Sequence, residues 1–451
     1  MNEREKVLEL FEKQKEQWQP KASENIEKYR KGDIKITVKG KDGKPLANAD
    51  VKLTQKTHDF RFGANIFMLD ELETTEKNDA YKKYFSDVFN MATLPFYWDT
   101  LEPEKGKPRY PKDSPKVYRR PAIDLCIEFC EKHGIEPREH ALAYDHFFPT
   151  WLKNESTDVV KREFEKRCSD IAERYADKIP TIEVTNEMFW GVDGSVTPFY
   201  HEPDFIEWCF KTAEKYFPNN KLCINEWTGA VWEHPTPNDN QYYSYIKANM
   251  EKNARIDAIG MQYHLFYHRE HEYNSTRKLL DPTVLYNSMD MYSTFGKPLQ
   301  ITEITVPAYS WNADDEEIQA KIIENLYTIW FSHPSVEQII YWNLVDGYAY
   351  CQYTDPLKIK ETQGDMTNGE NYYYGGLLRF DLSPKPAYLK IKELTQDIWH
   401  TSFSGNTDSS GVINTRGFYG SYEAEITVNG AKTTHLFNIS KDCSSDVTIE
   451  L

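Results

Sequence analysis

The middle of the chain, from about residue 61 to residue 398, alternates short apolar runs with longer amphipathic stretches. Short apolar runs bounded by turn residues predict buried strands, and apolar residues at intervals of three and four predict helices. The helical pattern is clear after Asp314, where Ile318, Ile322 and Leu326 follow an acidic first turn. Eight runs are predicted as strands, over residues 61–67, 88–98, 137–145, 181–188, 221–227, 256–264, 298–304 and 336–346.

Eight β/α repeats favour an α/β fold of the (β/α)₈ type, a TIM barrel over residues 61–398, because an open doubly wound sheet usually has five or six strands. The two ends of the chain have other patterns. Residues 1–32 predict one charged helix, whereas residues 33–60 and 399–451 alternate polar and apolar positions around turn residues. Because two-stranded sheets are only marginally stable alone, we expect strands from both ends to pair into a small accessory β unit.

Composition narrows the classes of function. The chain carries 54 Lys and Arg against 71 Asp and Glu, a net charge of −17 that would repel nucleic acid or an anionic membrane surface. No apolar run approaches the roughly 20 residues of a membrane span. The seven cysteines are scattered without CxxC pairs, so neither a disulfide framework nor a structural zinc site is indicated. Without a GxGxxG or GxxxxGK[ST] motif, no nucleotide cofactor is expected, and nothing in the sequence indicates the oligomeric state.

Polar residues stand where the predicted strands end, which is where a TIM barrel carries its active site. Asn186 and Glu187 end the fourth strand, and Thr302 and Glu303 end the seventh. A lone glutamate in such a place is more often a solvated loop residue, but two on facing strands favour a site. Two carboxylates across a barrel mouth suit glycoside hydrolysis, in which one protonates the leaving oxygen while the other attacks the anomeric carbon. Other strand ends carry His140, Tyr144, Asp145, Gln262, His264 and Trp342.

These and other segments resemble glycoside hydrolase family 10, the retaining endo-β-1,4-xylanase-like enzymes. The matching pieces, in order, are WDTLEPEKGK, REHALAYDHFFPTWL, EVTNE, IDAIGMQYH, ITEI, WNLVDGYAY and GGLLRFDLSPKPAYLKIKEL. They spread over most of residues 60–398, and the segment GKPLANADVKLTQKTHDFRFGANIF resembles the β leader that precedes the barrel in some members.

The resemblance implies a role for each matched residue. Glu187 would be the acid/base and Glu303 the nucleophile of a double displacement, so Glu187 would begin the cycle protonated and Glu303 ionised. His140, Asn186 and Gln262 would contact the sugar in subsite −1, His264 would hydrogen-bond the nucleophile, and Trp342 would form an apolar floor. The substrate would be a β-1,4-linked, possibly decorated xylan or a related polysaccharide.

The sequence departs from the family pattern around the sugar. Thr93, Leu94 and Tyr97 stand where the family shows a Glu, an Asn and a Lys that hold the sugar in subsite −2. Tyr144 and Asp145 replace a common Trp-His pair, and Tyr350 replaces a second Trp. We hypothesise that Leu94, Phe96 and Tyr97 give a flatter, more apolar surface that suits a decorated xylan or another β-linked glycan.

Two alternatives belong to other classes. A non-catalytic carbohydrate-binding barrel would keep the aromatic residues but lose a carboxylate. A metal-dependent hydrolase could use His264, His268 and His271 of HLFYHREH, although no HExxH glutamate follows. We therefore predict no metal or other cofactor. Because the substrate is a polysaccharide, we expect a secreted, periplasmic or cell-surface protein whose export signal is absent from this chain, since its first 30 residues are charged throughout.

Overall fold

Parallel strands close into a barrel in the computed structural model, which describes residues 3–189, 197–351, 356–441 and 446–451. Within these residues the barrel has the order β10-β3-β4-β5-β6-β7-β8-β9, which confirms the predicted fold. Each strand overlaps the run predicted for it. The bounds are β3 (Arg61–Asn65), β4 (Met91–Pro95), β5 (Glu136–His140), β6 (Thr181–Asn186), β7 (Lys221–Asn225), β8 (Ala258–His264), β9 (Leu299–Thr305) and β10 (Val336–Tyr341).

The barrel strands are buried on both faces. Every residue of β6 and of β9 is buried, including the polar residues Glu183 and Thr302. Side chains on one face fill the barrel and those on the other pack under the surrounding helices, so apolar and polar residues of these strands are buried alike.

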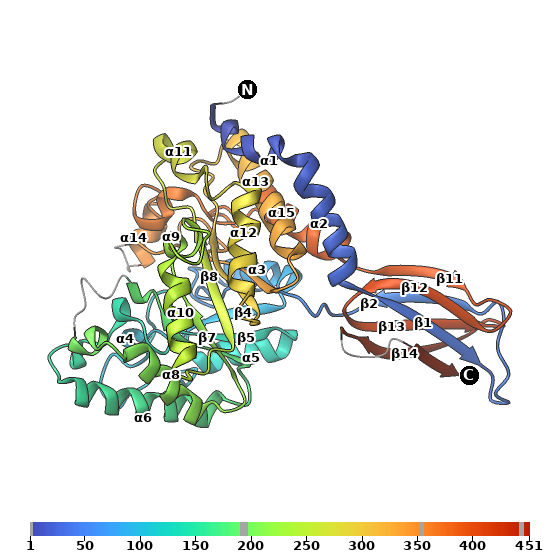
Figure 1. Ribbon diagram of the computed structural model, residues 1–451, viewed down its shortest axis with the longest axis horizontal. Helices are drawn as coiled ribbons and strands as arrows, with labels where there is room; N and C mark the ends of the chain where they lie inside the picture. The colour runs from blue at the N-terminus through green and yellow to red at the C-terminus, as the bar shows by residue number, and fades with distance from the viewer. Residues whose placement is uncertain (1–2, 190–196, 352–355, 442–445) are drawn as a thin grey trace.

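Helices cover the outside of the barrel (Figure 1). Local signals set their ends: Asp281 caps α12 by accepting a hydrogen bond from the Thr283 N–H, and α5 ends at Gly134, whose φ is +65°. In the described part of the chain, no helix has the length and apolarity to cross a membrane. The bounds are α1 (Glu9–Lys13), α2 (Lys15–Tyr29), α3 (Thr75–Val88), α4 (Trp98–Leu101), α5 (Ile123–His133), α6 (Thr157–Tyr175), α8 (Phe205–Tyr216), α9 (Thr228–Trp232), α10 (Gln241–Glu251), α11 (Glu272–Thr276), α12 (Pro282–Ser293), α13 (Ala313–Ser332), α14 (Pro356–Glu361) and α15 (Pro386–Glu393).

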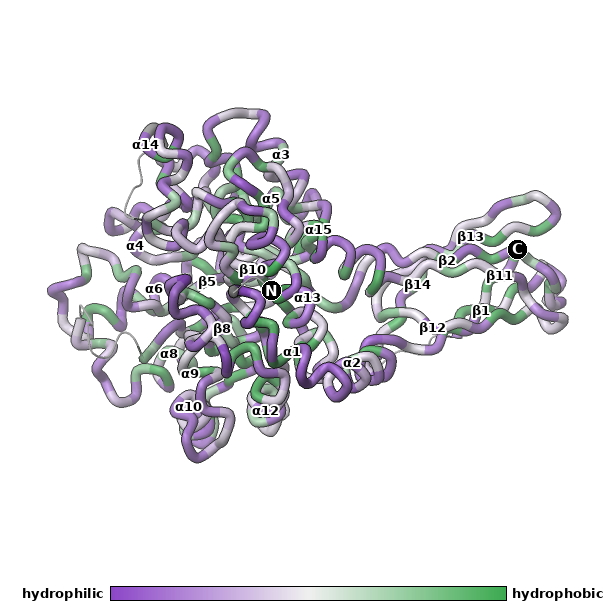
Figure 2. The backbone as a smooth tube through the Cα atoms, turned by 90° about the horizontal axis from the view of Figure 1, so that it is seen from above, coloured by the Kyte–Doolittle hydropathy of each residue, from purple (hydrophilic) through white to green (hydrophobic). Residues whose placement is uncertain are grey.

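Strands from the two chain ends form a separate accessory unit, as predicted. Its two sheets have the orders β12-β1-β15 and β11-β2-β13-β14, so β1 and β2 each lie between strands from the C-terminal end. Figures 1 and 2 both show this unit projecting from one side of the barrel. The bounds are β1 (Lys31–Lys39), β2 (Asp50–Gln55), β11 (Ser402–Asn406), β12 (Val412–Phe418), β13 (Gly420–Val428), β14 (Ala431–Ile439) and β15 (Asp446–Glu450).

An aromatic cluster and one arginine join the accessory unit to the barrel. Arg30, between α2 and β1, donates hydrogen bonds to the carbonyls of Phe331 (2.6 Å), His333 (2.5 Å) and Val336 (2.7 Å). Its guanidinium lies over the rings of Phe60 and Phe331, at 4.7 and 5.2 Å from their centroids. The junction lies at the end of the barrel where β10 begins, so it leaves the carboxyl ends of the strands open.

Candidate active site

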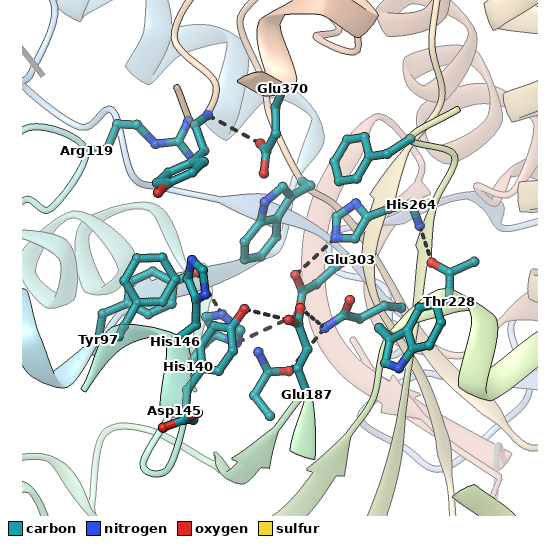
Figure 3. A pocket seen from close by; sticks show the side chains of 18 of the residues that line it. Tyr97, Arg119, His140, Asp145, His146, Glu187, Thr228, His264, Glu303 and Glu370 are labelled. Carbon is teal, nitrogen blue, oxygen red and sulfur yellow. Dashed lines mark hydrogen bonds and ion pairs between the residues drawn. The ribbon is translucent and has the colours of Figure 1, made fainter. Parts of the chain in front are cut away.

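A cavity of about 640 Å³ lies at the carboxyl ends of the barrel strands. Figure 3 shows side chains from several strands and loops pointing into it, with Glu187 and Glu303 near its centre. The structure brings all ten residues named from the sequence to the wall of this one cavity: His140, Tyr144, Asp145, Asn186, Glu187, Gln262, His264, Glu303, Trp342 and Tyr350.

The register between neighbouring strands places several of these residues at the same level along the barrel axis. Asn186 of β6 pairs with Asn225 of β7, and Gln262 of β8 pairs with Glu303 of β9. Because neighbouring strands of a parallel barrel end at the same rim, residues in register form one layer of side chains. Asn186, Gln262 and Glu303 of this layer line the cavity, whereas Asn225 is fully buried behind them.

A continuous chain of hydrogen bonds links the two glutamates through this layer. The Gln262 amide donates to Glu187 Oε1 (3.0 Å) and to Asn186 Oδ1 (3.1 Å). The Asn225 amide donates to the same Asn186 oxygen (2.9 Å) and to Glu303 Oε1 (2.9 Å). Three amide side chains therefore fix the positions of both carboxylates relative to each other.

The backbone of Glu187 has an unusual conformation. Its φ is +49°, in the left-handed region that a residue with a β-carbon seldom adopts, and its N–H donates to the Asn225 carbonyl (3.3 Å). The Tyr144 hydroxyl donates to Glu187 Oε2 (2.6 Å). Strain of this kind persists where surrounding contacts hold it, and here it directs the carboxylate into the cavity.

Glu303 is buried, with 2% of its surface exposed. Burial raises the pKa of Glu303 to about 8; His140 opposes this rise, and the charges of Glu183 and Glu187 add to it. Burial also lowers the pKa of His264 to about 4, so at neutral pH His264 contacts Glu303 Oε2 (3.2 Å) as a neutral ring. Burial and the neighbouring carboxylates thus act on Glu303 in the opposite direction from His140.

His140 is held on both ring nitrogens by protein groups. Nδ1 lies 2.8 Å from Glu183 Oε1, and Nε2 lies 3.0 Å from the Tyr97 hydroxyl. Although burial alone lowers the pKa of His140, the Glu183 and Glu303 carboxylates raise it above its usual value. The histidine thus connects Tyr97 at the cavity wall to the charged interior of the barrel.

Aromatic rings line one side of the cavity. Trp342 packs edge to face against Phe67, at 5.3 Å between ring centroids, and 5% of its surface is exposed. Tyr350 is 45% exposed at the outer rim. A flat buried ring with an exposed ring further out suits stacking against successive sugars.

The hypothesis of an apolar surface made by Leu94, Phe96 and Tyr97 is wrong for two of the three. Leu94 is fully buried in the core, and Phe96 packs edge to face on Tyr175 of α6 at 5.7 Å between ring centroids. Only Tyr97 reaches the cavity, and Thr93 is buried as well. All of β4 is buried, so its composition did not reveal which residues point inward.

The histidines of HLFYHREH do not gather into a metal site among the described residues. The group of three potential ligands there is His140, Glu183 and Glu303, whose ligand atoms lie within 4.8 Å of one another. Arg138 forms an ion pair with Glu183, and both side chains are fully buried. A fixed guanidinium at this point disfavours a second cation beside it.

Sequence reasoning missed several residues of the site. Asn225 ends β7 and could have been found by the rule that identified Glu187 and Glu303, since it also ends a strand. Arg119 and Arg120 lie in the loop before α5, and Glu370 lies in the short 3-10 helix Gly369–Tyr373; folding of the whole chain brings them to the cavity. Loop residues carry no periodic signal that a sequence pattern can report.

Comparisons with known proteins agree with this architecture. Xylanase 10B from Thermotoga petrophila, solved with xylobiose, superposes with a TM-score of 0.56 at 19% identity, covering 75% of this chain and 95% of that one. Xylanase 10B from Thermotoga maritima gives 0.56 at 20% identity, covering 75% and 96%. At this identity the likeness concerns the fold.

Sequence relatives include two longer proteins. Endo-1,4-beta-xylanase 1 of Arabidopsis thaliana is 25% identical over 436 residues, covering 94% of this chain and 40% of that protein. The anti-sigma-I factor RsgI6 of Acetivibrio thermocellus is 25% identical over 436 residues, covering 94% of this chain and 49% of that protein. The chain thus spans half or less of the length of these relatives. The family model described as glycosyl hydrolase family 10 matches residues 54–393, and the chain belongs to that family.

Proposed function

We propose that this protein is an endo-acting glycoside hydrolase that cleaves a β-1,4-linked xylan or a related polysaccharide with retention of configuration. The observation that carries the proposal is the pair Glu187 and Glu303 in one cavity, linked through Gln262, Asn186 and Asn225. The endo-1,4-beta-xylanases among its relatives support the choice of xylan. A polysaccharide substrate is found outside the cytoplasm, so we propose that the protein acts there.

In the first step, Glu303 attacks the anomeric carbon as the glycosidic C–O bond breaks, and Glu187 gives its proton to the departing oxygen. The products are a glycosyl ester on Glu303 and a free alcohol on the leaving chain. In the second step, water attacks the anomeric carbon and gives a proton to Glu187 as the ester bond to Glu303 breaks, so Glu303 leaves as a carboxylate and Glu187 is again protonated. Two inversions at one carbon retain its configuration.

Two hydrogen-bond contacts of Glu303 favour the ionised form that this step requires. The Asn225 amide donates to Glu303, and the His264 ring does so when its proton is on Nε2. That tautomer leaves Nδ1 to accept from the Thr305 hydroxyl, which lies 3.0 Å away. Hydrogen bonds to a carboxylate favour its ionised form, so they oppose the effect of burial on Glu303.

Substitution of each glutamate tests the proposal. Glu303→Gln should abolish turnover on every substrate, because an amide cannot form the ester. Glu187→Ala should spare aryl glycosides with good leaving groups, and added azide should restore its rate and yield a glycosyl azide of retained configuration. Glu233→Gln, at an exposed position, serves as the matched control. Appreciable turnover by Glu303→Gln, or an azide product of inverted configuration, would refute the assignment.

A second candidate is a barrel that binds glycans without cleaving them. It is suggested by one observation: 94% of this chain matches a relative, RsgI6, that is named as an anti-sigma-I factor and not as an enzyme. Incubation of the wild-type protein with xylan and chromatography of the products separates the two functions. New reducing ends support hydrolysis, whereas saturable binding without products supports the second candidate.

A further inference from the structure

Two arginines line one side of the cavity. Arg119 and Arg120 precede α5, and they are 4% and 6% exposed. In Figure 3, Arg119 and Tyr97 lie on the opposite side of the cavity from Thr228 and His264, with Glu303 between the two sides. A substrate that reaches across the centre of the cavity would therefore extend toward the arginines.

Arg120 is a buried cation held mainly by aromatic rings. Its guanidinium lies 4.0 Å from the ring centroid of Tyr97, 5.1 Å from that of Phe67 and 5.3 Å from that of Phe147. Nη1 donates to the Arg119 carbonyl (3.0 Å), and Nε is buried without a hydrogen-bond partner among the described residues. Burial lowers the pKa of Arg120 to about 10, so the side chain is still charged at neutral pH.

Arg119 also contacts only neutral groups. Its two terminal nitrogens each donate to Asn343 Oδ1 (3.3 Å), and Nη1 donates to the Tyr348 carbonyl. Its Nε, like that of Arg120, is buried without a partner in the part of the chain that the structure describes. Neutral oxygens solvate a guanidinium but do not balance its charge.

Carboxylates are near these arginines but are not paired with them. Glu370 accepts hydrogen bonds from the Asn343 amide (2.8 Å) and from the Tyr350 N–H (3.3 Å). Asp99 is half-buried, and its carboxylate raises the pKa of Arg120 without forming an ion pair with it. Among the described residues, no carboxylate oxygen lies within 4.0 Å of either guanidinium. Arg138, which is also buried, differs in that it forms an ion pair with Glu183.

We propose that Arg119 and Arg120 bind a carboxylate of the substrate, so that the protein prefers a glycan bearing uronic acid. The inference rests on the proposed function and adds the substrate class. A guanidinium donates through a planar fork that matches a carboxylate, and a buried unpaired cation gains most from a partner of opposite charge. A neutral sugar hydroxyl would fill the same space but would leave both charges unbalanced.

Because the net charge of the chain is −17, the two arginines are important for binding an acidic substrate. An acidic polysaccharide is repelled by most of the protein's surface, so its recognition depends on positive charge inside the cavity. Positive charge is present at the end of the cavity where the Arg120 guanidinium lies over the ring of Tyr97. Because these charges are shielded from solvent, salt should screen their effect less than it screens the repulsion outside.

The test compares two substrates that differ in one group. One is a xylo-oligosaccharide carrying glucuronic acid, and the other is the same compound with the carboxylate reduced to a primary alcohol. We expect wild-type kcat/KM to favour the acidic compound by about ten- to a hundredfold, the range for a charge-assisted pair. Arg120→Gln should remove most of the preference, and Arg120→Lys should keep part of it. Arg162→Gln, an exposed arginine on α6, makes the same charge change and should keep all of it.

The ratio of the two rates within each variant cancels any general damage from a substitution. Equal efficiency of the wild type on both compounds, with xylan still cleaved, overturns the inference and leaves the proposed function standing. Cleavage of neither compound nor of xylan contradicts the proposed function instead. Calorimetric titration of the same two compounds then decides the inference, which is overturned if the reduced compound binds as tightly as the acidic one.

Discussion

Asn225 offers a sharp test of how the cavity controls its carboxylates. Its side chain donates to Glu303 Oε1 (2.9 Å) and accepts from the Thr302 hydroxyl (2.7 Å). Asn225→Asp keeps the shape of the side chain but replaces the amide donor with an oxygen. A stabilising hydrogen bond to the proposed nucleophile then becomes a contact between two acidic groups.

The size of the effect follows from the geometry. Two unit charges 2.9 Å apart repel by about 6 kcal/mol at an effective dielectric constant of about 20. One of the two carboxyl groups must therefore stay protonated across the neutral range, as in a carboxylate dyad. Removal of the amide donor alone, as in Asn225→Ala, forfeits a charge-assisted bond worth about 1.5–3 kcal/mol, or roughly a 10- to 150-fold loss of rate.

The assay measures kcat/KM at pH 6 on one xylo-oligosaccharide for the wild type and both variants. We expect Asn225→Ala to lose about 10- to 150-fold, and Asn225→Asp to lose at least a further tenfold because it adds repulsion. Asn287→Asp, at an exposed position of α12, makes the same chemical change far from the cavity and should be silent. Circular dichroism checks that each variant folds.

Two results would refute this reasoning. If Asn225→Asp kept within about threefold of the wild-type rate, the contact with Glu303 would be irrelevant to catalysis. If the aspartate and alanine variants lost equal activity, the added charge would have no effect, and the low effective dielectric assumed for the cavity would be wrong.

Three further predictions concern packing and stability. Gly260→Ala should lower both stability, by about 1–3 kcal/mol, and activity, because a β-carbon there would lie 2.4 Å from Asn225 Oδ1; chemical denaturation and kcat measure the two effects. Burial raises the pKa of Glu139 to about 8, so the native state binds more protons than the unfolded state between about pH 4.5 and 8. The free energy of unfolding should therefore fall as pH rises through this range, and Glu139→Gln should weaken this pH dependence in urea titrations. Arg30→Ala leaves three carbonyls unpaired and should lower stability by about 3–5 kcal/mol while kcat is unchanged, which thermal unfolding and an activity assay together check.

The barrel and its two glutamates could be predicted from the sequence because both depend on local order along the chain. Most barrel strands lie in short runs rich in apolar and β-branched residues, and residues at the carboxyl end of such a run must lie at the rim. The sequence therefore located both glutamates, because Glu187 directly follows β6 and Glu303 lies near the end of β9, although the two are far apart in sequence. The pairing of both chain ends was also predictable, since neither set of strands could be stable alone.

The tertiary structure alone decided which of several equivalent residues face the cavity. In β4 and the residues after it, Leu94, Phe96 and Tyr97 are all apolar and all buried, so no alternation distinguishes the cavity from the core. The direction of each side chain depends on the tilt of the strand and on the helix packed behind it, as Tyr175 is packed behind Phe96.

The same holds for charge. Arg119 and Arg120 stand in a loop whose sequence resembles any solvated basic pair, and such a pair on a surface would have water as its partner. Closure of the barrel places them against Tyr97 and Asn343, where water is excluded and a cation needs an anion. The sequence determined the scaffold and the position of the two glutamates, whereas the fold determined which buried charges are left without a partner, because desolvation depends on contacts between distant parts of the chain.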